Sequence, residues 1–139
     1  MQDGKIKNGA TAPDVSRSRP SFREAISRAE RQVDYEAICY DSPSDRAIAH
    51  ELCAIIAEVY MMNPDGPIRI SGEWMDGYMV QQVFAELDDQ HVRAVIEEFG
   101  RLTADIRNKK AYLRTSLYNS VFTLSAHYTN RVNYDLSKT

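Results

Sequence analysis

The chain has 139 residues, of which 43% are hydrophobic and 27% are charged, and its formal net charge at pH 7 is −3. This length suits one compact domain, and the composition is that of an ordinary globular protein. The longest apolar run, residues 52–62, is interrupted by Glu58, and no apolar segment follows the N-terminus. The sequence therefore indicates neither a membrane span nor a secretory signal, and we expect a cytoplasmic protein.

The small net charge conceals three segments of different sign. Residues 1–33 carry seven Lys and Arg against four Asp and Glu, residues 34–100 carry three against fourteen, and residues 101–139 carry seven against two. A nearly neutral total argues against a nucleic-acid partner, but a basic segment at the end of an acidic protein reopens that question.

Two cysteines, Cys39 and Cys53, lack the CxxC spacing of redox or zinc motifs. Free, buried thiols in a reducing compartment are the expected state, and a disulfide between the two is the less supported alternative.

The N-terminal part divides into a linker and the start of a folded domain. Residues 1–20 are rich in Gly, Pro and Ser and have little apolar periodicity, which predicts a disordered linker behind a further N-terminal domain. The ordered domain is then expected over residues 21–139. Ser21 and Glu24 match a capping box, and the helix that follows has a narrow apolar side, so we expect it to pack peripherally. A short helical turn is expected next, ending before residues 41–43.

Apolar side chains recur at helical spacing in three further segments, and each recurrence predicts a buried helix face. The first helix is expected after a cap at Ser42 or Ser44, the second near residues 76–86, and the third from Asp88 to near Gly100. The side chains expected on their buried faces are Ile48, Leu52, Ile55, Ile56, Val59, Val80, Val83, Phe84, Leu87, Val92, Val95, Ile96, Phe99 and Leu102.

Residues 68–70 alternate like a strand, but a single strand cannot form a sheet, so we expect them to lie extended across the helices. The predicted architecture is all-α, a compact bundle of five or six short helices.

Residues 106–120, IRNKKAYLRTSLYNS, combine basic and aromatic side chains in one expected helix from about residue 108 to 120. A shorter helix is expected from Thr123. On a helical wheel, an apolar stripe separates from an adjoining basic face with Lys109 on the other flank. The stripe contains Ile106, Leu113 and Leu117, and the basic face contains Arg107, Lys110, Arg114 and Tyr118.

This basic face has two interpretations. It is either a solvated surface whose aliphatic stems cover apolar neighbours, or a contact for phosphates with tyrosines beside it that can stack on bases. For the second interpretation we predict that Arg107, Lys110 and Arg114 have no intramolecular carboxylate partners. Tyr118 and Asn119, near the expected helix end, are predicted to serve structure before function.

Motifs for catalysis or metal binding are missing from the sequence. His50, His91 and His127 form no HxxxH or Cys/His cluster, and there is no phosphate-binding glycine loop or nucleophile elbow. The adjacent acids at 88–89 and 97–98 point about 100° apart on a helix and cannot share a site. We therefore predict a non-enzymatic protein with neither metal nor cofactor. Trp74 is expected to plug into the core, and a partner-binding hot spot is the alternative.

Five segments spread over the chain resemble one protein family. They are YEAICYDS, IRISGEWM, VFAELDDQHVRAVIEEF, IRNKKAYLRTSLYNS and HYTNRVNYDL. Together they resemble the C-terminal domain of the replication initiator protein A family, found on plasmids and integrative elements of Gram-positive bacteria. The similarity extends over residues 33–136. It is most specific at Ile106, Asn108, Tyr112, Leu113, Leu117, Tyr118 and Asn119.

The domain is also similar, more distantly, to the C-terminal helical domain of DnaD-type primosome proteins. Their motif has a Tyr, a branched apolar residue four positions later and a Trp four positions after that. Tyr112 matches the first position, whereas Ser116 and Ser120 occupy the other two.

The resemblance implies an accessory domain of DNA replication initiation that follows a winged-helix domain, and that domain would read the DNA sequence. We expect weak, non-specific DNA contacts from this domain, because phosphate contacts position a protein without specifying bases. The expected contact residues are Arg107, Lys109, Lys110, Tyr112, Arg114, Tyr118 and Arg131. The alternative is a protein-interaction module that forms homo-oligomers or recruits host helicase-loading factors, which the acidic middle segment favours.

Overall fold

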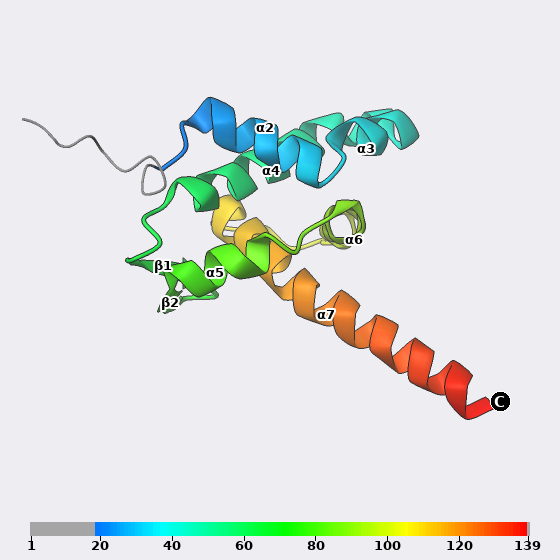
Figure 1. Ribbon diagram of the computed structural model, residues 1–139. Helices are drawn as coiled ribbons and strands as arrows, with labels where there is room; N and C mark the ends of the chain where they lie inside the picture. Colours follow the sequence, from blue (N-terminus) through cyan, green and yellow to red (C-terminus); the bar gives the residue numbers. More distant parts are fainter. Residues whose placement is uncertain (1–18, 139) are drawn as a thin grey trace, which may run out of the picture.

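The computed structural model describes the backbone of residues 19–138 and the side chains of residues 19–124. The linker predicted over residues 1–20 lies almost entirely outside the described residues, and the side chain of Arg131 lies outside them as well. The described part contains six α-helices and one two-stranded antiparallel sheet (Figure 1). The fold is therefore dominated by helices, as predicted, but it is not purely α-helical.

Helix α2 (Phe22–Gln32) begins with the predicted capping box. The Ser21 hydroxyl accepts a hydrogen bond from the Glu24 backbone N–H at 3.2 Å, and the Glu24 carboxylate accepts one from the Ser21 N–H at 2.9 Å. Only Ala25 and Ala29 of α2 are buried, which agrees with the expected narrow apolar side, and these small side chains let α2 lie directly against α4 (Figure 1).

Helix α3 (Tyr35–Asp41) and the 3-10 helix η3 (Pro43–Asp45) lead into α4 (Arg46–Met61). Neither Ser42 nor Ser44 caps α4, because η3 intervenes and the Ser42 hydroxyl instead donates to the Asp45 carboxylate at 2.8 Å. Helix α4 ends before the turn residues 63–67, as predicted, and most of its apolar side chains lie in the core.

The segment around residue 68 is the first strand of a hairpin. Strand β1 (Pro67–Ile70) pairs with β2 (Glu73–Asp76), and this pairing sets Ile68 opposite Met75 and Arg69 opposite Trp74. The turn uses two positive φ angles, 54° at Ser71 and 81° at Gly72. The expectation of a lone extended segment is wrong because residues 73–76 form the second strand.

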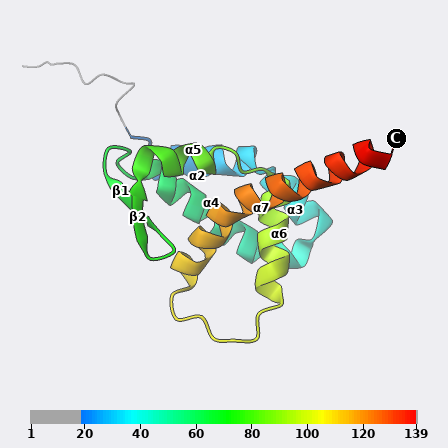
Figure 2. The ribbon, with the colours of Figure 1, turned by 90° about the horizontal axis from the view of Figure 1, so that it is seen from below.

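Helices α5 (Gly77–Phe84) and α6 (Asp89–Gly100) follow, and Asp76 and Asp88 cap them. Helix α7 (Lys109–Lys138) is continuous, so the predicted break near Thr123 is absent (Figure 2). It begins after Asn108, whose side-chain carbonyl accepts from the Ala111 N–H at 3.0 Å.

The predicted core is largely confirmed. Of the side chains expected on buried helix faces, most are buried, together with Leu113 and Leu117 from α7. Ile48, Val83, Ile96 and Phe99 are only half-buried at its edge. Leu102 is exposed because α6 ends at Gly100 and leaves it in the loop that follows. Within the described residues, no helix combines the length and apolar character needed to cross a bilayer.

Candidate functional site

The basic residues at the start of α7 face acidic residues of α4. Glu51 and Glu58 are seven positions apart on α4, which places them two turns apart on one side of that helix. The Lys109 ammonium lies 3.0 Å from the Glu51 carboxylate, and the Lys110 ammonium lies 2.9 Å from that of Glu58. The predicted absence of intramolecular carboxylate partners is therefore wrong for Lys110, and Lys109 is paired in the same way.

Arg114 is paired less completely and is more buried. Its side chain is only 16% exposed, and its nearest carboxylate is that of Glu58, at 4.0 Å from Nη2. Its Nη1 donates a long 3.5 Å hydrogen bond to the Arg69 carbonyl, and its buried Nε has no partner among the described residues. Because Glu58 already holds Lys110, two cations share one carboxylate, and this part of the surface keeps one excess positive charge.

The other predicted contact residues whose side chains the structure describes do not join these cations. Arg107 is exposed but precedes α7, as does Ile106, so the helical wheel does not apply to either. Tyr118 is packed in the core beside Phe122, as its predicted structural role requires, and half-buried Tyr112 packs near Phe99. Asn119 lies within continuous α7, so its predicted place near a helix end is wrong.

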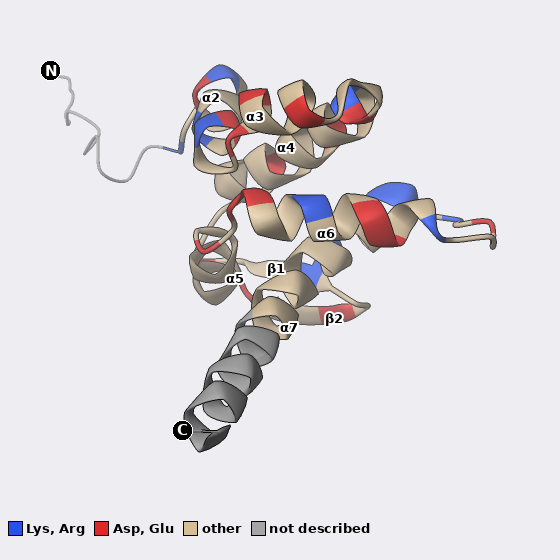
Figure 3. Ribbon diagram, turned by 90° about the vertical axis from the view of Figure 1, so that its right-hand side faces the viewer, with Lys and Arg blue, Asp and Glu red and all other residues tan. Residues whose placement is uncertain are grey.

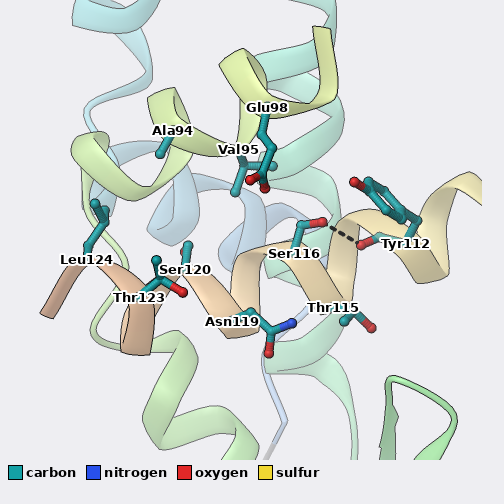
Figure 4. Close-up of a pocket in the computed structure, with 10 residues that line it drawn as sticks. All are labelled: Ala94, Val95, Glu98, Tyr112, Thr115, Ser116, Asn119, Ser120, Thr123 and Leu124. Carbon is teal, nitrogen blue, oxygen red and sulfur yellow. Dashed lines mark hydrogen bonds between the residues drawn. The ribbon is translucent and has the colours of Figure 1, made fainter. Parts of the chain in front are cut away.

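Residues 106–120, which we call the motif, also line a groove of about 290 Å³ between α6 and α7 (Figure 4). Its α7 wall is polar, but the Ser116 and Ser120 hydroxyls donate to the Tyr112 and Leu117 carbonyls within the helix. Glu98 is the one acidic side chain in the lining. The groove therefore holds no pair of groups suited to nucleophilic or acid–base chemistry.

A wider hollow of about 600 Å³ lies between α3 and α6. Asp41 on its wall is bound by Arg93 at 2.9 Å, and Arg93 also binds Asp89 at 3.1 Å. Acidic and basic residues lie close together along α6 (Figure 3), but the lining of this hollow contains three acids, Asp41, Asp45 and Glu97, against one base, Arg93. Across the part of the chain that the structure describes, no three His, Cys, Asp or Glu side chains converge as a metal site requires.

Large apolar side chains are exposed on the hairpin and at the start of α5. Trp74 is 65% exposed, Tyr78 is 61% exposed and Met79 is 54% exposed. The Arg69 guanidinium lies 5.2 Å from the centre of the Trp74 ring. We call these four residues the hairpin surface.

The prediction that Trp74 plugs into the core is wrong, and the hairpin register explains why. Ile68 and Ile70 occupy the buried face of β1, so Arg69 and the opposite Trp74 face solvent. The alternation in residues 67–70, followed by Ser-Gly, is the signal that could have revealed the hairpin.

A family model described as a family of unknown function, DUF6017, matches residues 6–139. The chain belongs to the DUF6017 family. Searches of curated proteins and of solved structures returned no match for this DUF6017 chain. The description of the DUF6017 family assigns no activity.

Proposed function

We propose that this domain is a non-enzymatic accessory module of a replication initiator from a plasmid or mobile element, and that its principal partner is a protein. The link to replication is supported by the sequence resemblance to the replication initiator protein A family. The choice of a protein partner is supported by one observation above all. Carboxylates of α4 pair with the cations that the motif would offer to DNA.

This pairing lowers the charge available to phosphates. Lys109, Lys110 and Arg114 together carry three positive charges, and Glu51 and Glu58 offset two of them. Each neutralised phosphate contributes about 0.9 to the slope of log affinity against log salt concentration. A surface with one net charge therefore supports a slope near one, which is too small for useful DNA affinity on its own.

The second candidate function is weak, non-specific DNA contact. It is favoured by the excess charge where Lys110 and Arg114 share Glu58, and by the exposure of Arg107. Ion pairs at an exposed surface contribute only about 0–1 kcal/mol each, so the phosphates of DNA could displace the glutamates and bind the cations themselves.

Fluorescence anisotropy with labelled single- and double-stranded oligonucleotides at low salt separates the two functions. We expect no binding by the wild-type protein. Glu51→Gln with Glu58→Gln should create weak, salt-sensitive binding, because it removes the two acids that face the lysines. The matched control is Glu36→Gln with Glu86→Gln, which makes the same change in net charge at exposed acids outside the described ion pairs.

The opposite result would identify DNA as the partner. That result is wild-type binding with a salt slope near three, lost when Lys109, Lys110 and Arg114 are replaced by Ala.

A further inference from the structure

The hairpin surface leaves three large apolar side chains exposed to solvent. The role that we infer for it rests on the proposed function and identifies the protein partner. We propose that it is a contact between two copies of this chain, centred on Trp74. Three large apolar side chains, each more than half exposed, occur within six consecutive residues there.

The exposed area fits a modest dimer. Side chains of this size have roughly 200–250 Å² of surface, so exposures of 65%, 61% and 54% leave about 400 Å² of apolar surface in water. If both copies bury this apolar area, the dimer buries about 800 Å² of apolar surface. Polar side chains around it would bring the total buried area towards the roughly 1,200 Å² of a small specific interface.

The charges around Trp74 are mixed, which favours a second copy over a partner of one sign. Arg69 lies beside the Trp74 ring, the exposed Glu73 precedes Trp74 in the same strand, and Asp65 and Asp76 lie at the other end of the hairpin. The Gly77 N–H donates to the Gly66 carbonyl at 3.1 Å and so holds the Asp65 turn against the start of α5. The acids would repel a nucleic acid, and Arg69 would repel a uniformly basic protein. A copy related by a two-fold axis can place its Arg69 against these acids, and its own acids against the first Arg69.

The hairpin is held firmly enough to present this surface. A Cβ at Gly77 would lie 2.3 Å from the Gly66 carbonyl oxygen, so glycine permits this close contact. The Ser71 N–H donates to the Thr115 hydroxyl at 2.9 Å, which anchors the turn to α7. Little ordering is therefore needed on association, and a preordered surface loses less entropy when it binds.

Sedimentation equilibrium over a range of protein concentrations tests the contact. We expect the average mass of the wild-type protein to rise towards that of a dimer, and Trp74→Ala to weaken association by roughly tenfold or more. Tyr40→Ala is the matched control, because Tyr40 is an aromatic residue on α3 that is 87% exposed, and it should leave association unchanged. Far-ultraviolet circular dichroism confirms that each variant is folded.

Charge exchange between two variants gives a second test. Arg69→Glu alone and Asp65→Lys alone should each associate weakly, because each places like charges opposite one another. An equimolar mixture should associate again. In the mixed dimer the introduced carboxylate of one variant meets the introduced ammonium of the other, and the remaining native Asp65 meets the remaining native Arg69.

A wild-type protein that stays monomeric at several hundred micromolar, an unchanged Trp74→Ala variant, or a mixture that does not recover would each overturn the proposal. Each of these results leaves the proposed function standing with a different protein partner, because the oligonucleotide experiment alone decides between protein and DNA.

Discussion

Gln32 connects three helices through one side chain, and replacing it by Ala tests that role. Its amide nitrogen donates to the Phe84 carbonyl at 2.8 Å and to the Leu87 carbonyl at 2.9 Å. Its amide oxygen accepts from the Tyr60 hydroxyl at 2.6 Å. Burial raises the pKa of Tyr60 above its usual 10, so the hydroxyl is protonated at neutral pH and remains a donor. Gln32 thus joins the end of α2 to α4 and to the end of α5.

The cost of Gln32→Ala follows from these three bonds. A hydrogen bond contributes about 0.5–1.5 kcal/mol net, and a buried group left without a partner costs about 1–3 kcal/mol. Tyr60 keeps a weaker bond to the Phe84 carbonyl at 3.2 Å, and water can reach part of the half-buried site. We therefore expect a loss of roughly 2–4 kcal/mol in the free energy of unfolding.

Urea denaturation followed by circular dichroism measures this loss. With a slope of about 1–3 kcal/mol per molar urea, the midpoint should fall by roughly 0.7–4 M. Gln82→Ala is the matched control, since Gln82 is exposed on α5. A double-mutant cycle with Tyr60→Phe should show coupling of about 0.5–3 kcal/mol between the two side chains. Equal midpoints for the Gln32 and Gln82 variants would refute the reasoning.

Two further predictions concern the core. Leu117 is fully buried between α7 and the other helices, so Leu117→Ala should cost about 2–5 kcal/mol in urea denaturation, and a cost below about 1 kcal/mol would show that the site is loosely packed. Burial raises the pKa of Cys53 to about 12, so the folded protein holds this thiol protonated at pH 8 and it should not react with Ellman's reagent until urea unfolds the chain. Above the ordinary thiol pKa of 9.0 an unfolded Cys53 loses its proton while the folded one keeps it, so stability should fall as the pH rises towards 12.

Local sequence rules predicted the helices well. The capping box at Ser21, the cap at Asp88 and the stop after α4 depend on neighbouring residues, and all three are present. The hairpin was missed because strand pairing depends on a partner segment, and EWMD shows little alternation by itself. Trp74 was misplaced for the same reason, since its exposure follows from the register that buries Ile68.

The candidate site was harder to predict than the fold. The sequence pattern draws attention to the basic residues of α7, but their charge partners lie 58 and 52 positions earlier in the chain. Glu51 and Glu58 occupy one side of α4, and their approach to α7 depends on how the two helices pack. A helical wheel describes one helix and contains no information about such a neighbour.

Arg114 contacts both α4 and the hairpin, so it connects the basic residues of α7 to the hairpin surface. Its guanidinium reaches Glu58 on α4 and the carbonyl of Arg69 on the hairpin, and the next residue, Thr115, accepts from the Ser71 N–H. Replacing Arg114 by Ala would therefore remove a cation from the motif and also loosen the support of the hairpin surface. A loss of association in that variant could not be assigned to charge. The Glu51→Gln and Glu58→Gln variant leaves Arg114 and its hairpin contacts in place, so it changes the charge of the motif and keeps the hairpin anchored.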